Sequence, residues 1–145
     1  MIALADLEGV WRLDRQIEDR RAGLSGLLEG EAVWQPDGTG LTQIETGLLR
    51  YGDAAPMQAT RRYLWREEAG LLRVYFDDGR PFHELTGAAP EARHVCPPDI
   101  YDVRYDLTGW PDWSARWHVT GPRKEAVITS QYRRRTGAVS VRGAD

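Results

Sequence analysis

An all-β fold, with a single antiparallel up-and-down β-barrel of about eight to ten strands, is predicted by three features of this sequence. Apolar and polar residues alternate with a period of two along most of the chain, as in strands with one buried face. Turn-forming residues such as Gly, Pro and Asp interrupt this alternation at short intervals. Six Trp, six Tyr and two Phe supply bulky residues for a core. The expected strands cover residues 7–17, 26–35, 41–50, 57–67, 71–77, 81–86, 92–96, 100–107, 113–120 and 125–134.

The first stretch shows the pattern clearly. Its odd positions include Leu7, Trp11, Leu13 and Ile17, whereas its even positions are mostly polar or charged. The stretch 41–50 is apolar on both sides, and the later stretches alternate between turn signals. Only residues 1–6 are expected to begin with a helical turn.

A barrel is favoured over a sandwich by the connections. Consecutive strands joined by short turns indicate an up-and-down order, and closing that order removes exposed sheet edges. Gly9, Gly30 and Gly47 lie inside predicted strands, where glycine is typical of bends at barrel corners. A sandwich of the same strands remains the alternative. One barrel domain is expected over residues 1–135, and the small, polar tail 136–145 is expected to fray.

The composition excludes several classes of protein. A chain of 145 residues suits one domain, and no apolar run approaches the ~18 residues that a membrane-spanning helix needs. The single cysteine, Cys96, excludes an internal disulfide framework. Because the N-terminus also lacks the basic region of a signal peptide, we expect a cytoplasmic protein. A net charge of −3 argues against a protein that binds nucleic acid through bulk charge.

Three charged residues share the phase of apolar neighbours and should point into the barrel. Arg15 follows Trp11 and Leu13, Glu45 lies in phase with apolar neighbours in the third stretch, and Arg61 is in phase with aromatic residues of the fourth. An unpaired charge there would be costly, so each needs a partner. The alternatives are an internal ion pair, an arginine-based anchor for an anionic ligand, and a bulge that turns one of them outward.

The histidines and the cysteine suggest a second kind of site. His94 and Cys96 share one face of a strand, and Asp99 follows a Pro-Pro break, so these residues could begin a zinc site or form a Cys–His pair. The simpler interpretation is that His94 hydrogen-bonds a neighbour and Cys96 fills space. His83 and His118 each adjoin a residue expected to point inward, and both should therefore face outward in regular strands.

Two turns carry cations. Asp78-Gly79-Arg80-Pro81 is predicted to be a hairpin turn in which glycine supplies a positive φ. Arg80 and His83 could then hang over the mouth of a barrel. The turn at residues 121–124 carries Lys124, the only lysine of the chain.

Several of these segments resemble known families. Gly9-Val10-Trp11 resembles the Gly-x-Trp signature of lipocalin-like (calycin) barrels, in which the tryptophan closes one end and an arginine of the last strand packs across it. That arginine would be Arg133, Arg134 or Arg135. Segments 78–83, 94–101 and 117–124, together with this motif and Glu45-x-Gly47, are similar to an uncharacterised bacterial domain-of-unknown-function family (6314) over about residues 7–134. The resemblance implies a calycin-like barrel and carries no established activity.

We therefore expect a barrel that binds a small, partly apolar, anionic molecule. Arg15 and Arg61 would supply charge-assisted donors, and Glu45 would orient one of them. No metal and no cofactor are expected. The partner would be a small molecule rather than nucleic acid or a membrane, and a homodimer is left open. The candidate ligand-binding residues are Arg15, Trp34, Glu45, Arg61, Tyr63, Trp65, Arg80, His83, His94, Tyr101, Tyr105 and Trp117.

Two other functions compete with this interpretation. The first is an enzyme of lyase or isomerase type, with Glu45 or His94 as general base and a tyrosine such as Tyr101 as acid. The second is a haem- or metal-binding barrel that uses His83, His94 or His118.

Overall fold

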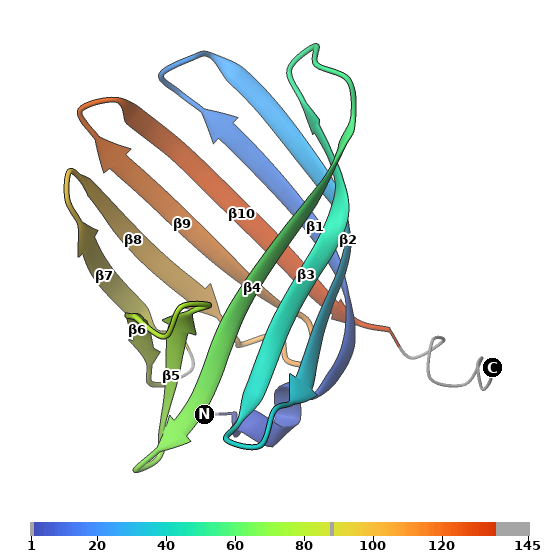
Figure 1. Ribbon diagram of the computed structural model, residues 1–145, viewed down its shortest axis with the longest axis vertical. Coiled ribbons are helices and arrows are strands. Elements are labelled where there is room, and N and C mark those ends of the chain that lie inside the picture. Colours follow the sequence, from blue (N-terminus) through green and yellow to red (C-terminus); the bar gives the residue numbers. More distant parts are fainter. Residues whose placement is uncertain (1, 88, 136–145) are drawn as a thin grey trace.

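The alternation seen in the sequence produces ten antiparallel strands in one sheet that curls into a nearly closed barrel (Figure 1). This is a computed structural model, and it describes residues 2–87 and 89–135. Each predicted stretch coincides with one strand, so the all-β up-and-down fold class is confirmed; the tail 136–145 lies outside the described residues. No helix in the described part is long and apolar enough to cross a membrane. The elements are η1 (Leu4–Leu7), β1 (Gly9–Asp19), β2 (Leu24–Pro36), β3 (Leu41–Tyr51), β4 (Met57–Glu68), β5 (Leu71–Phe76), β6 (Pro81–Leu85), β7 (Glu91–Cys96), β8 (Asp99–Asp106), β9 (Trp113–Gly121) and β10 (Lys124–Arg134).

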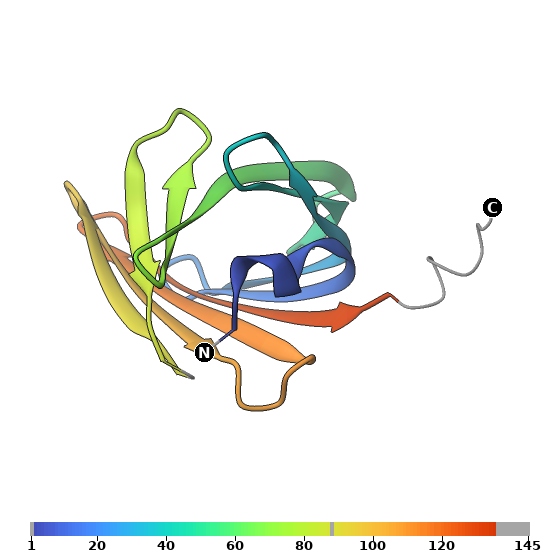
Figure 2. The same cartoon turned by 90° about the horizontal axis from the view of Figure 1, so that it is seen from below.

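The Gly-x-Trp motif closes the lower end of the barrel. Trp11 is fully buried, and its Nε1 donates a hydrogen bond to the Leu7 carbonyl at 2.8 Å. The guanidinium of Arg134 lies 3.9 Å from the centroid of the Trp11 ring, so Arg134 is the arginine of the last strand that packs across the tryptophan. Gly9 has a φ of +124°, and a Cβ there would meet Arg134 Nη1 at 2.9 Å. Seen from below, η1 lies across this end (Figure 2).

The lower half of the barrel is filled by aromatic rings, whereas the upper half is less completely filled. Buried Trp34 and Trp113 pack on Trp11, and Trp65 packs on Trp34. Trp113 also stacks on Tyr132 with 4.1 Å between ring centroids. Farther up, four residues packed against this core are only half-buried: Leu49, Ala59, Tyr101 and Trp117. The interior therefore changes from a packed core to a partly exposed mouth.

A close approach of two strands requires glycine in β2. Gly30 lies opposite Gly47 of β3, and a Cβ on Gly30 would collide with the carbonyl oxygen of Thr46. Any side chain at residue 30 would push β3 away.

The barrel is not closed by hydrogen bonds all the way round. In the described ranges, no ladder pairs β6 with β7, which are the two edges of the sheet. The β6–β7 seam, as we call this line, is packed by side chains: His94 of β7 lies 5.5 Å from Phe76 and 5.3 Å from Phe82, between ring centroids.

One sequence prediction is corrected beside the seam. The pairing of β5 with β6 shifts between Val74 and Tyr75, so Val74 lies opposite His83 and Tyr75 opposite Pro81. This bulge breaks the alternation, and Phe82 and His83 are both buried. The expectation that His83 faces outward is therefore wrong. His118 does lie on the outer face, 3.6 Å from Glu125.

Candidate functional site

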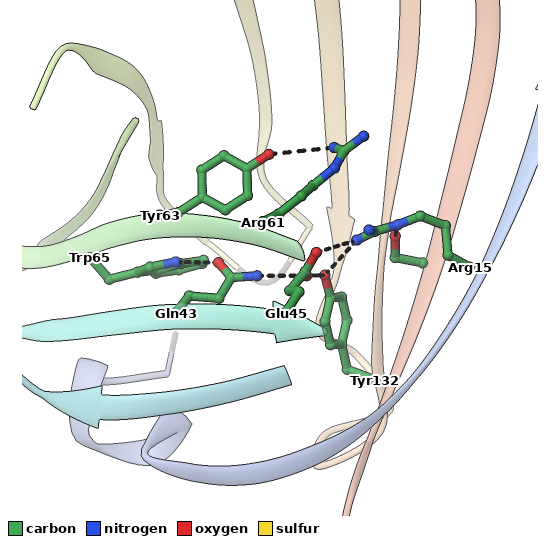
Figure 3. Close-up of polar contacts among 8 residues, drawn as sticks. Arg15, Gln43, Glu45, Arg61, Tyr63, Trp65 and Tyr132 are labelled. Carbon is green, nitrogen blue, oxygen red and sulfur yellow. Dashed lines mark hydrogen bonds and ion pairs between the residues drawn. The ribbon is translucent and has the colours of Figure 1, made fainter. Parts of the chain in front are cut away.

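A chain of buried polar side chains crosses the interior of the barrel (Figure 3). Arg15 of β1 forms an ion pair with Glu45 of β3, with 2.9 Å between Nη2 and Oε1. The two side chains are only 5% and 3% exposed. The hydroxyl of Tyr132 on β10 donates to Glu45 Oε2 at 2.6 Å. These contacts connect β3 with β1 and β10.

Neighbouring polar groups complete the network. Gln43 Nε2 donates to Glu45 Oε2 at 2.7 Å, and Gln43 Oε1 accepts from Trp65 Nε1 at 2.6 Å. Arg15 Nε donates to Ser130 Oγ at 2.8 Å. Gln43, Ser130 and Tyr132 are not among the residues predicted from the sequence. Each nevertheless shares the inward phase of its strand, which is the signal that could have found them.

Pairing decides the charge state of this network. Burial, the largest single influence, lowers the pKa of Arg15, but Glu45 together with Tyr132 and Tyr63 outweighs it, so this pKa lies above its ordinary value. Burial, followed by the Glu45 charge, raises the pKa of Tyr132. Glu45 Oε1 accepts from Arg15, and Oε2 accepts from both Gln43 and Tyr132, so a proton taken from a ligand would neutralise the charge that balances Arg15. The geometry supports the ion-pair alternative for Arg15 and Glu45.

A cavity of about 20 Å³ adjoins the network and has room for about one water-sized group. In its wall, His83 Nε2 lies 2.9 Å from the Tyr105 hydroxyl. Burial, with a smaller contribution from His94, lowers the pKa of His83 to about 3, so the imidazole is neutral near pH 7. The lining residues are Arg15, Gln43, Glu45, Tyr63, Trp65, Val74, Phe82, His83, Tyr105, Trp113, Ala115, Trp117, Ser130 and Tyr132.

Arg61 lies nearer the surface than Arg15 and borders an open hollow of about 440 Å³ between β4 and the β5–β6 turn. Its guanidinium carbon lies 5.6 Å from the centroid of the Trp117 ring, and Nη1 donates to the Tyr63 hydroxyl at 3.4 Å. Burial raises the pKa of Tyr63, although Arg61 works against this, so the hydroxyl stays neutral. Among the described residues, Arg61 has no ion-pair partner. Tyr63 borders both the hollow and the cavity, so the two are adjacent.

The other predicted residues lie apart from the cavity. Trp34 is buried in the closed end, 6.2 Å from Trp11 between ring centroids. His94 and Tyr101 pack around Phe82 near the β6–β7 seam, with 6.2 Å between their ring centroids. Arg80 is exposed in the β5–β6 turn, where it pairs with Asp78 at 2.7 Å and lies over the ring of Phe76.

No group of three or more His, Cys, Asp or Glu side chains that could hold a metal ion occurs within residues 2–87 and 89–135. His94 is half-buried beside the seam, and Cys96 is exposed at the end of β7. Asp99 pairs instead with Lys124, with 3.2 Å between Oδ2 and Nζ. The histidine pattern thus forms no ligand set of the usual size in the described residues.

Comparison with known proteins identifies a family and a fold. Residues 7–134 match a family described as a family of unknown function (DUF6314). The solved structure of the S-type phycobiliprotein lyase CPES from Guillardia theta is similar, with a TM-score of 0.58 and 8% sequence identity. The match covers 90% of this chain and 89% of the lyase chain. It confirms the lipocalin-like barrel. No curated protein matches the sequence.

Proposed function

The chain belongs to a family of unknown function (DUF6314), and we propose from the geometry of its site that the barrel binds a small, partly apolar anion at the hollow beside Arg61. The anionic group lies on the Arg61 guanidinium, and the apolar part packs on Tyr63, Phe76 and Trp117. Binding, rather than a particular reaction, is the function that this site supports.

The unpaired charge of Arg61 is the observation that carries the proposal. Arg15 is neutralised by Glu45, whereas Arg61 has no ion-pair partner among the described residues. Within residues 2–87 and 89–135, the only hydrogen bond of its side chain goes to the neutral Tyr63 hydroxyl, so most of its donors are free for a carboxylate, sulfonate or phosphate. A half-buried guanidinium strengthens such a contact because less water competes for it.

The surroundings of Arg61 favour a ligand with both an anionic and an apolar part. Phe76 and Trp117 are half-buried aromatic residues, and Trp117 lies beneath the guanidinium. Asp77 and Asp78 also border the hollow, but Asp78 is paired with Arg80. The similar solved structure is that of a phycobiliprotein lyase. At 8% identity this similarity supports a ligand-binding barrel here and does not identify the ligand.

The test compares two arginines of neighbouring strands. Arg61 of β4 is half-buried and borders Trp117 and the hollow, whereas Arg50 of β3 is exposed, does not border the hollow and carries the same charge. We expect anilinonaphthalene sulfonate to bind the wild type, and Arg61→Ala to weaken binding about tenfold or more, as loss of a charge-assisted hydrogen bond would do. Arg50→Ala should change the Kd less than twofold, which corresponds to less than about 0.4 kcal/mol.

The neutral dye N-phenylnaphthylamine has the same rings without the sulfonate. It should bind the wild type more weakly than the sulfonate does, and Arg61→Ala should not weaken it further. Equal losses of sulfonate binding in Arg61→Ala and Arg50→Ala would show bulk attraction rather than a site and would overturn the proposal.

A further inference from the structure

Two hydrogen-bonding groups in the wall of the interior cavity lack partners. His83 Nδ1 and Trp113 Nε1 are buried and have no hydrogen bond within the described part of the chain. Both residues line the cavity of about 20 Å³, and they are only 8% and 4% exposed. Buried polar groups nearly always have a hydrogen-bond partner, so two unpaired groups around one cavity indicate that a bound molecule supplies the missing partner.

The hydrogen-bond pattern decides whether His83 offers a donor or an acceptor. Neutral imidazole carries one proton, and burial keeps His83 neutral near pH 7. If Nε2 held the proton, the Tyr105 hydroxyl would have no acceptor in the described part of the chain, and Nδ1 would also be unpaired. If Tyr105 donates to Nε2, only the Nδ1–H is unpaired. The second tautomer leaves fewer groups unsatisfied, so His83 presents an N–H, as the indole of Trp113 does.

The unpaired groups in this wall are therefore donors, and their complement is an oxygen acceptor. The neighbouring Arg15–Glu45 pair is already neutralised, so the cavity offers no net charge that would attract a second anionic group. The cavity has room for about one oxygen-sized group. It adjoins the hollow through Tyr63, and Trp117 both lines the cavity and contacts Arg61.

We propose that the interior cavity is a subsite for a neutral acceptor oxygen, such as a ketone carbonyl, of the same ligand whose anionic group lies on Arg61. The ligand class is then an oxo acid with an apolar body, bound with its carbonyl inward and its anionic group at the mouth. This inference rests on the proposed binding of an anion at Arg61.

The experiment uses two carboxylates that differ in one oxygen. Phenylbutyrate and benzoylpropionate have the same chain and ring, and only benzoylpropionate carries a ketone. We expect isothermal titration of the wild type to show benzoylpropionate binding roughly threefold to tenfold tighter, the usual range for one net hydrogen bond. His83→Gln keeps a partner for Tyr105 but removes the donor at the Nδ1 position, and should abolish this preference. His83→Asn places an amide N–H near the Nδ1 position and should restore part of it.

A second measurement needs no variant and remains decisive if the His83 variants fold poorly. The ¹⁵N spectrum of the wild type should show His83 protonated at Nδ1, and benzoylpropionate should shift that N–H signal whereas phenylbutyrate should not. Protonation of His83 at Nε2 would overturn the carbonyl subsite alone. So would equal affinities of the wild type for the two carboxylates, provided that Arg61→Ala still weakens the binding of both. If neither carboxylate binds, or Arg61→Ala binds both as the wild type does, the proposed function fails and this inference fails with it.

Discussion

The buried imidazole of His83 makes stability depend on pH. Burial lowers its pKa to about 3 in the folded protein, whereas an unfolded chain has a histidine pKa of about 6.5. Between these values the unfolded chain binds a proton that the folded protein does not, so stability falls as the pH falls. This contribution is complete above about pH 6.5 and is lost progressively towards pH 3, at up to about 1.4 kcal/mol per pH unit.

Urea unfolding at pH 7, 5 and 4 measures the free energy of unfolding and tests this expectation. The wild type should lose more free energy of unfolding over this interval than His83→Phe, which has no group to protonate at this position. Near pH 7 the variant should be folded, as judged by circular dichroism. Parallel pH profiles for the two proteins would show that His83 does not contribute in this way.

At the scale of the strands, alternation located all ten strands, because nearly every stretch has a buried or half-buried face that a period of two reveals. It failed at residues 82 and 83, where the bulge opposite Val74 and Tyr75 places two successive side chains inside. A bulge is decided by the fit between two paired strands, and neither strand carries that information alone. The gap between β6 and β7 could not be predicted for the same reason: alternation specifies faces and not the closure of the sheet.

The β6–β7 seam should be the first place where the barrel opens. The edge strands β6 and β7 have five and six residues, and no ladder joins them in the described ranges. Local opening there breaks fewer hydrogen bonds than opening between β1 and β2, which pair over eleven residues. Amide hydrogen exchange should therefore be faster in β6 and β7 than in β1 and β10. Protection of β6 and β7 equal to that of β1 would contradict this expectation.

At the scale of the whole molecule, the sequence located the inward charges but could not assign their partners. The phases of Arg15, Glu45 and Arg61 place all three side chains on inner faces. Glu45 lies directly opposite Arg61 in the ladder, yet its ion pair is with Arg15, two strands away. Strand tilt and barrel curvature decide which side chains meet in the interior, and the alternation along one strand carries no information about tilt or curvature. This is why an anchor at Arg61 and a structural pair at Arg15 could be distinguished only in the folded chain.

The Arg15–Glu45 pair should hold the two sides of the barrel together, because Glu45 contacts residues of β1 and β10 from β3. Glu45→Gln leaves the buried Arg15 charge uncompensated and should lower the free energy of unfolding by about 3 kcal/mol or more in urea. Replacing both residues, as Arg15→Met with Glu45→Leu, should cost less than the sum of the two single changes.

An exposed ion pair on the outer face provides the control for this cycle. Arg93 and Asp102 lie 2.7 Å apart with side chains 64% and 39% exposed, so Asp102→Asn should cost less than about 1 kcal/mol. The comparison separates burial from pairing, since both pairs have short contacts and only one is removed from water. If losses at Arg15 and Glu45 simply add, and Glu45→Gln costs no more than Asp102→Asn, the pair does not stabilise the barrel across its interior. Without a stabilising ion pair to Glu45, Arg15 would be as good a candidate as Arg61 for the anchor of an anion.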